Sequence, residues 1–300
     1  MRSDLWSDKD FQKESGKFNV NLSNWRKEGR IASMLCVRNP DNENNGRRYL
    51  LTLLMDLLYL SEPSDKDLYH KINNRNFGNP YVVKHFDTEI DYDYYYSIQE
   101  YKTLKEHVSL EKKIFLEIGA GYGRLCHSIL SLEAIEKYFI VDLPETLCIS
   151  KIYLKEVLPE ELFRKITFVD ALNEFSFFSE DVDIVINVAS MNEMLAEVVS
   201  NYLKWIDQHS KYFYGINPVG KYHPSSIYQN KNCFEEFNVK SAINVGPILD
   251  VFDLWDYETI KKLVPRYIDV YKPSDKWEVV HHESSLPWLS LHRVIYKNRK

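Results

Sequence analysis

The middle of the chain alternates short apolar runs with segments of helical spacing, and this alternation limits the fold more than any other feature. The apolar runs are typical of buried strands, and each is followed by a polar break or a helical pattern. Connections of this kind join parallel strands and place helices on both faces of a sheet. We therefore expect an α/β fold with strands at 113–118, 138–141, 166–169, 183–188 and 212–216, and helices at 124–132, 146–157 and 192–210.

Two further strands are predicted near the end of the chain, at 277–282 and 289–296. The segment between them is too short for the crossover that two parallel strands need. The last strand should therefore run antiparallel, in a sheet that is otherwise mostly parallel and has seven strands.

The part before this alternation is predicted to be mostly helical. Leucines recur at helical spacing over 47–60, and a second helix is expected over 91–108. The second helix carries Tyr92, Tyr94, Tyr95, Tyr96 and Tyr101. We interpret these rings as a packing face, with a stacking wall for a sugar or a base as the alternative. The predicted organisation is a helical N-terminal extension over 1–108 that covers a substrate, followed by one domain over 109–300.

Charge and cysteine content exclude several classes of protein. The 300 residues contain 38 Lys and Arg against 44 Asp and Glu, a net charge of −6, which disfavours nucleic acid as the main partner. The four cysteines form no zinc-binding spacing and suggest a reduced chain. The first ten residues lack the apolar stretch of a signal peptide, and the longest apolar run, 49–60, is too short to span a bilayer. We expect a cytoplasmic protein.

The strongest local motif is a glycine turn between the first predicted strand of the alternation and the following helix. It reads Gly119-Ala120-Gly121-Tyr122-Gly123, and glycines there permit a tight turn and a close approach of backbone to ligand. The dinucleotide fingerprint is G-x-G-x-x-G/A, and Arg124 stands at its sixth position. Glu117 precedes the first glycine by two residues, which disfavours a pyrophosphate and favours a cationic ligand.

Residues 117–123 resemble the first motif of class I S-adenosylmethionine-dependent methyltransferases, which have a Rossmann-like sheet. The resemblance implies S-adenosylmethionine as the cofactor, with Asp142 holding the ribose hydroxyls and Asp170 lying near the adenine amine. For both acids the alternative is the capping of a helix or turn. The cofactor-binding residues that the resemblance implies are Glu117, Gly119, Ala120, Gly121, Gly123, Asp142, Leu143, Asp170 and Asn187.

A narrower resemblance extends over about residues 75–220. The strings at 116–123, 140–146 and 190–194, with Gly78-Asn79-Pro80 upstream, are similar to sugar O-methyltransferases of bacterial glycan clusters. This similarity implies a small-molecule or glycan acceptor that is methylated on a hydroxyl. The alternatives are a methyltransferase with an aromatic or natural-product acceptor, a dehydrogenase, and a non-catalytic Rossmann-like scaffold.

Methyl transfer to a hydroxyl is promoted by a base, or by a metal that lowers the pKa of the hydroxyl, at the carboxyl edge of the sheet. Glu193 follows the fourth strand and His223 follows the fifth, and we predict these two as catalytic. The alternatives are a helix first-turn acid for Glu193 and a surface histidine for His223. His281 and His282 lie in the final hairpin, and at most one of them should face the site. No set of metal ligands is predicted, a bound divalent ion is left open, and the sequence does not indicate an oligomeric state.

Overall fold

The computed structural model describes residues 24–28, 46–222, 245–252 and 256–300. The described residues belong to two compact units. The first unit contains Phe115–Gly119 and the described part of Ser176–Lys300, and the second contains the described part of Lys17–Ile114 together with Ala120–Phe175. The predicted division of the chain at residues 108 and 109 stays a prediction.

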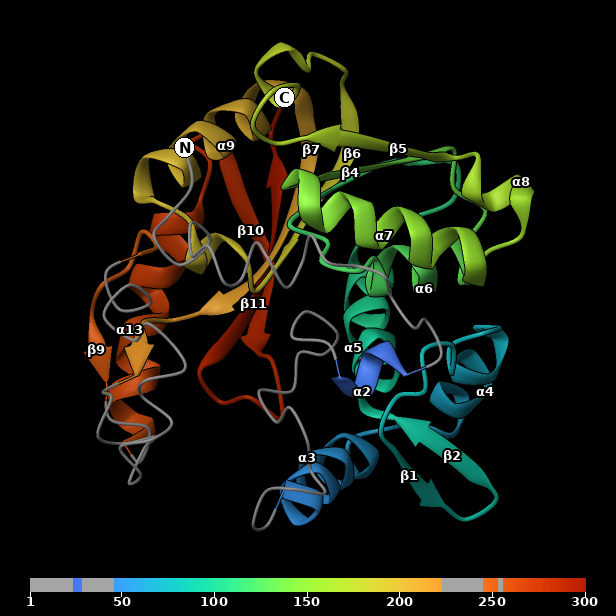
Figure 1. Cartoon of the computed structure of the whole chain (residues 1–300). Helices are drawn as coiled ribbons and strands as arrows, with labels where there is room; N and C mark the ends of the chain where they lie inside the picture. Colours follow the sequence, from blue (N-terminus) through green and yellow to red (C-terminus); the bar gives the residue numbers. More distant parts are fainter. Residues whose placement is uncertain (1–23, 29–45, 223–244, 253–255) are drawn as a thin grey trace. The chain divides into compact units, whose positions relative to one another are not determined.

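A mixed seven-stranded sheet has the strand order β10-β11-β7-β6-β3-β4-β5. Figure 1 shows its long antiparallel strands β10 and β11 next to each other. Parallel pairing joins β3 to β6, β6 to β7, and β4 to β5, whereas β11 is antiparallel to both β7 and β10. The predicted Rossmann-like, mostly parallel sheet with an antiparallel last strand is therefore confirmed. Its strands are β3 (Ile114–Ile118), β4 (Lys137–Asp142), β5 (Ile166–Asp170), β6 (Val182–Val188), β7 (Ser210–Pro218), β10 (Trp277–Ser284) and β11 (Leu291–Asn298).

The chain order of the sheet reverses between β3 and β6. Connections lead from β3 to β4 and β5 on one side and from β6 to β7 on the other. Open α/β sheets bind their ligands at such a switch point, beyond the carboxyl ends of the strands. The register pairs Ile118 with Asn187 at this end, so the glycine turn begins at the switch point.

In the first unit, the helical pattern after β6 forms two elements rather than one. A 3-10 turn, η3 (Met191–Glu193), is followed by extended backbone at Met194 and Leu195 before α9 (Ala196–His209) begins. The predicted helix start at residue 192 was therefore wrong by four residues. The remaining elements of this unit are β8 (Lys221–Tyr222), β9 (Val251–Phe252) and α13 (Tyr257–Tyr271), with η2 (Phe175–Phe177) at its border.

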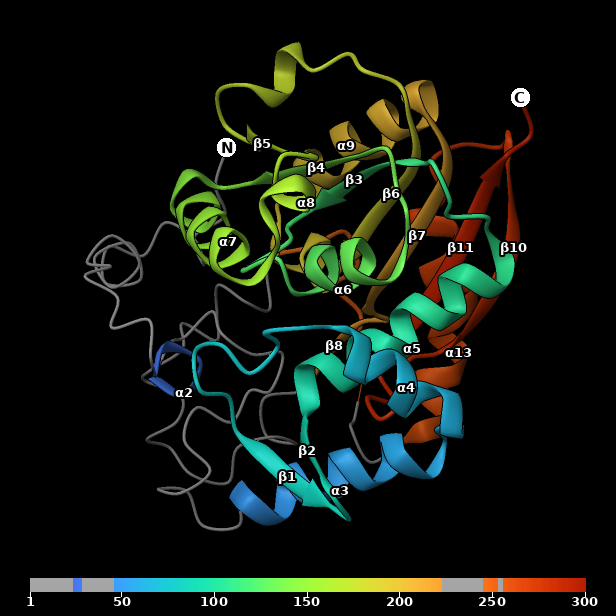
Figure 2. The ribbon, with the colours of Figure 1, turned by 90° about the vertical axis from the view of Figure 1, so that its right-hand side faces the viewer.

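The second unit is mostly helical apart from the sheet strands β4 and β5 and a short two-stranded hairpin. Its helix α5 (Tyr92–His107) packs against α3, α4 and α6 (Figure 2). The other elements are α2 (Trp25–Glu28), α3 (Gly46–Tyr59), α4 (Pro63–Lys71), β1 (Val82–His85), β2 (Thr88–Asp91), α6 (Arg124–Leu132), α7 (Pro144–Val157) and α8 (Glu160–Phe163). The hairpin β1–β2 and the helices α2 and α4 were not predicted.

The tyrosines of α5 are core residues. All five are at most 2% exposed, as are Ile98 and Leu104 on the same helix. Because their rings are covered by protein, the packing interpretation is confirmed and the stacking-wall alternative was wrong. None of the described helices has the length and apolar character that crossing a membrane requires.

Candidate functional site

One side chain near the end of β6 and one just after this strand both bind the end of β3. The carbonyl oxygen of Ile118 accepts hydrogen bonds from Asn187 Nδ2 (2.9 Å) and from Ser190 Oγ (3.0 Å). Gly119 has a φ of +73°, and a β-carbon there would lie 2.1 Å from Ser190 Oγ. The first glycine of the turn is therefore required by its close approach to the segment after β6.

Asn187 also joins β6 to β7. Its Oδ1 accepts from Asn217 Nδ2 (2.8 Å), and Asn217 Oδ1 accepts from the amide of Asn192 (3.3 Å). Asn187 and Asn217 are both fully buried. Asn187 was predicted as a cofactor ligand, and the contacts observed for it hold strand ends in place, while its contact with a cofactor stays a prediction.

The predicted catalytic acid Glu193 is the last residue of η3. Burial lowers the pKa of Lys221, and the carboxylate of Glu193 partly offsets this lowering. Lys221 Nζ donates to the carbonyl oxygen of Asn192 (2.8 Å), which ties β8 to η3. Asn192 Oδ1 is buried and has no hydrogen-bond partner in the described part of the chain. Asn192 was not predicted as a site residue, because a single polar side chain in a turn carries no sequence pattern that indicates a function.

The glycine turn continues into the second unit, where it meets the acid at the end of β4. The amide of Gly121 donates to Asp142 Oδ2 (3.0 Å), and the amide of Leu143 donates to Oδ1 (2.7 Å). Burial raises the pKa of Asp142 to about 7, although these two amides lower it. The helix α7 has its N-cap at Leu143, so Asp142 does not cap that helix. Its oxygens bind amides of the turns that follow β3 and β4, as the turn-capping alternative describes, and a contact of Asp142 with a ribose stays a prediction.

The glycines at 121 and 123 differ in their surroundings. A β-carbon at Gly123 would lie 2.7 Å from Leu154 Cδ1, whereas one at Gly121 would meet no atom of the described residues within 4 Å. Gly121 has a φ of +59°, so its backbone also favours glycine. Open space therefore adjoins the residue whose amide contacts the Asp142 carboxylate, and this arrangement fits a ligand that approaches the backbone closely.

Asp170 stands at the end of β5 as predicted. Its Oδ1 accepts from the amides of Leu172 (2.8 Å) and Asn173 (3.3 Å), and Oδ2 accepts from Asn173 Nδ2 (2.8 Å). The capping alternative describes these contacts, because both oxygens bind the turn that follows the strand. A contact of Asp170 with an adenine stays a prediction.

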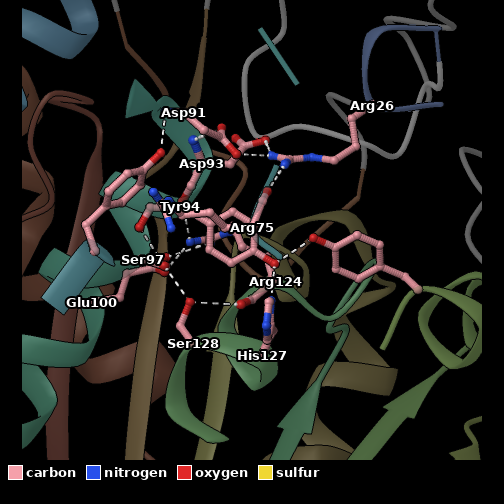
Figure 3. A network of polar contacts seen from close by, with 12 residues as sticks. Arg26, Arg75, Asp91, Asp93, Tyr94, Ser97, Glu100, Arg124, His127 and Ser128 are labelled. Carbon is pink, nitrogen blue, oxygen red and sulfur yellow. Dashed lines mark hydrogen bonds and ion pairs between the residues drawn. The ribbon is translucent and has the colours of Figure 1, made fainter. Parts of the chain in front are cut away.

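Arg124, at the position where the dinucleotide motif has glycine, is directed away from the turn into the core of the second unit. Its Nη1 and Nη2 lie 2.6 and 3.0 Å from the two carboxylate oxygens of Glu100, and Nη1 also donates to the carbonyl oxygen of Asp93 (Figure 3). The carboxylate of Glu100 raises the pKa of Arg124 although burial opposes it. This pair joins α6 to α5, a contact between distant segments that no local pattern signals.

The final hairpin lies at the carboxyl edge of β7, as expected, because Leu291 pairs with Pro218. His282 Nδ1 lies 3.1 Å from His292 Nε2, while His281 Nε2 lies 3.5 Å from Glu283 Oε1. Burial lowers the pKa of His292 to about 4, so this ring is neutral at neutral pH. His223 lies outside the described residues.

Glu117 is 3% exposed and pairs with Ile186 across β3 and β6. A carboxylate is therefore buried one residue before the strand ends. Within the described ranges, no group of three or more His, Cys, Asp or Glu side chains is arranged to hold a metal ion.

Comparison with known proteins gives structural neighbours of low identity. No family model matches the chain, and no curated protein matches its sequence. A superposition on the pyocyanin biosynthetic protein PhzM covers 65% of this chain and 53% of PhzM, at 12% identity and a TM-score of 0.41. An S-adenosylmethionine-dependent methyltransferase from Clostridium acetobutylicum matches over 70% of this chain and 93% of its own, at 12% identity and a TM-score of 0.43. A protein of the NADB-Rossmann superfamily from Streptococcus agalactiae matches over 71% and 70%, at 12% identity and a TM-score of 0.41.

Proposed function

We propose that this protein is an S-adenosylmethionine-dependent methyltransferase that acts on a hydroxyl of a sugar or glycan precursor. The observation that carries the proposal is the hydrogen bond from the amide of Gly121 to the carboxylate of Asp142, together with the open space beside Gly121. A carboxylate whose two oxygens are fixed by backbone amides is suited to receive the two hydroxyls of a ribose. Hydrogen bonds to a charged group contribute about 1.5–3 kcal/mol each.

The same arrangement favours a cationic nucleoside over a dinucleotide. A pyrophosphate is bound by free backbone amides at a glycine turn and helix N-terminus. The amide of Gly121 is already donated to a carboxylate, and Asp142 would repel a phosphate at that position. Arg124 offers no compensating charge, because Glu100 holds its guanidinium. A sulfonium compound carries no pyrophosphate, so neither the bonded amide nor the carboxylate opposes its binding.

When bound, S-adenosylmethionine supplies an electrophilic methyl group. The residues of this chain that we assign to the acceptor are Glu193, which follows β6, and His223 as the base. An acid and a histidine in these places suit a hydroxyl, which is a poor nucleophile until its proton is removed. The sugar class of the acceptor rests on the similarity of the strings at 140–146 and 190–194 to sugar O-methyltransferases.

Calorimetric titration with S-adenosylmethionine and, separately, with NAD tests the cofactor. The proposal expects saturable binding of the first and none of the second, and the reverse result would make the chain a dinucleotide-binding protein. Incubation with labelled S-adenosylmethionine and a panel of nucleotide sugars, glycans and phenols tests the acceptor. Label on a phenol alone would replace the sugar by an aromatic acceptor, and binding with no transfer to any acceptor would favour the scaffold alternative.

A further inference from the structure

A single helical turn, α2, is embedded in the second unit. The side chains of Trp25 and Arg26 are buried, and the amide of Arg26 donates to the carbonyl oxygen of Gly78 (3.0 Å). Gly78 has a φ of +84°, and a β-carbon there would lie 2.3 Å from Trp25 Nε1. The Gly78-Asn79-Pro80 string therefore contains the residue on which α2 docks, and this glycine is needed for the close approach.

Charge fixes α2 to the start of α5. Arg26 Nη2 lies 2.6 Å from Asp91 Oδ2 and 3.3 Å from Asp93 Oδ2, and Nη1 donates to the carbonyl oxygen of Arg75 (Figure 3). Burial raises the pKa of Asp91 to about 6, and Arg26 opposes this rise. A buried carboxylate pair of this kind is costly without a cation beside it, so Arg26 is required where it stands.

The same two residues of α2 contact the glycine turn. The guanidinium carbon of Arg26 lies 5.4 Å from the centroid of the Tyr122 ring, within the range of a cation–π contact. Trp25 meets the same ring edge-on, with 5.3 Å between centroids. Tyr122 is buried and its hydroxyl has no hydrogen-bond partner among the described residues, so packing and the cation–π contact are what hold the ring.

Tyr122 stands between two glycines that both have positive φ. Glycines on either side make this stretch of backbone permissive, and it is the large ring between them that can be anchored. We infer that Trp25 and Arg26 are positioning residues that fix Tyr122 and thereby hold the ligand-facing side of Gly121 ready for the cofactor. The inference rests on the proposed function for the identity of the ligand. A turn that is ordered before binding loses less conformational entropy when the ligand arrives.

A double-mutant cycle tests the coupling, with S-adenosylmethionine affinity measured by calorimetry well below the unfolding temperature of every variant. Trp25→Ala and Tyr122→Ala should each weaken binding roughly tenfold, and the double variant should be little weaker than either one. Tyr122→Phe keeps the ring and loses no hydrogen bond, so it should bind like the wild type. Unchanged affinity in Trp25→Ala, or fully additive losses in the double variant, would overturn the inference.

Asp65→Asn supplies the matched control. The carboxylate of Asp65 is completely buried and pairs with Lys102 (2.6 Å) on α5, away from the turn. This variant should lose stability and keep the cofactor affinity. If its affinity falls as far as that of Trp25→Ala, general destabilisation explains both and the inference fails. Trp25→Ala is chosen over Arg26→Ala because it leaves the buried charges paired.

Amide hydrogen exchange at residues 120–123 separates this inference from the proposed function. Exchange there should be faster in Trp25→Ala than in the wild type and unchanged in Asp65→Asn, and the measurement needs no ligand. Absence of S-adenosylmethionine binding by the wild type would refute the proposed function alone. Unchanged exchange in Trp25→Ala would refute the positioning role whatever the ligand is.

Discussion

Arg124 and Glu100 form a bidentate ion pair in the core of the second unit, with N–O distances of 2.6 and 3.0 Å. Glu100 is completely buried and Arg124 is 6% exposed. The arginine occupies the first position of α6, directly after the glycine turn. Arg124 stands where the dinucleotide motif has glycine, and its ion pair with Glu100 joins α6 to α5.

Replacing one member of this pair should be strongly destabilising. Removing one partner leaves a buried charge uncompensated, which costs about 3–5 kcal/mol. Arg124→Met and Glu100→Gln should therefore each lower the free energy of unfolding by roughly this amount, and the double variant should recover part of the loss. Urea denaturation of the three proteins measures it. Losses below about 1 kcal/mol would mean that the pair is solvated in solution.

The two glycines of the turn should respond differently to a side chain. Gly123→Ala places its β-carbon 2.7 Å from Leu154 Cδ1 at a φ of +92°, so it should reduce stability through both a clash and backbone strain. Gly121→Ala meets only strain, because the space beside it is open, and the left-handed conformation costs about 1–2 kcal/mol. We expect the lower unfolding temperature for Gly123→Ala, measured on the ligand-free proteins.

Gly121→Val extends this comparison to binding. Its side chain would fill the space that the cofactor needs, so affinity for S-adenosylmethionine should fall by about tenfold or more while the protein stays folded. Calorimetry measures the affinity, and circular dichroism checks the fold. A folded Gly121→Val variant with wild-type affinity would place the ligand elsewhere.

Asp142 should make both stability and binding depend on pH. Burial raises its pKa to about 7, above the value of about 3.9 for an unfolded aspartate. The neutral carboxyl is favoured in the folded protein, so the stability it contributes is complete below about pH 4 and is lost as the pH rises to about 7. Asp142→Asn cannot ionise. The unfolding temperature of this variant, relative to the wild type, should therefore increase over this interval and then level off.

Cofactor binding should follow the opposite course. The ionised carboxylate is the better acceptor for ribose hydroxyls, so wild-type affinity should increase as the pH passes through about 7. Asp142→Asn should bind roughly tenfold more weakly above that pH and show no such limb. An affinity that is independent of pH in the wild type would assign the ribose contact to another residue.

The sequence predicted well those elements whose pattern is local and strongly apolar. The strands of the alternation and α3, α5, α6 and α7 were all found, because buried runs and helical leucine spacing mark them directly. The helix α13 was missed because Pro265 lies inside it, and a proline there predicts an interruption. The hairpin β1–β2 was missed because its strands are four residues each and carry polar side chains.

In the candidate site too, the sequence indicates contacts that follow a known spacing and does not indicate contacts between distant residues. The contact of Gly121 with Asp142 was foreseeable, because both stand at carboxyl ends of neighbouring strands and follow known spacing. The contact of Arg26 with Tyr122 joins residues nearly a hundred positions apart, and no spacing rule connects them. For Asp170 the sequence could not decide between two roles, because an acid at the end of a strand can bind the amides of the next turn as readily as it can bind a ligand.

Glu193 and His223 should affect turnover and leave cofactor affinity unchanged. Glu193→Gln and His223→Gln keep the size of the side chain and remove its charge or basicity, and each should reduce kcat by roughly 10²-fold or more. If the histidine is the base, wild-type activity should rise through the neutral range, near the ordinary pKa of about 6.5, and His223→Gln should lose that limb. Glu193→Gln should keep the limb at a lower rate, because this acid orients the acceptor.

Steady-state kinetics over pH, with binding by calorimetry, measures both effects. Full activity in His223→Gln would transfer the base to Glu193 or to one histidine of the final hairpin, of which His282 already contacts His292.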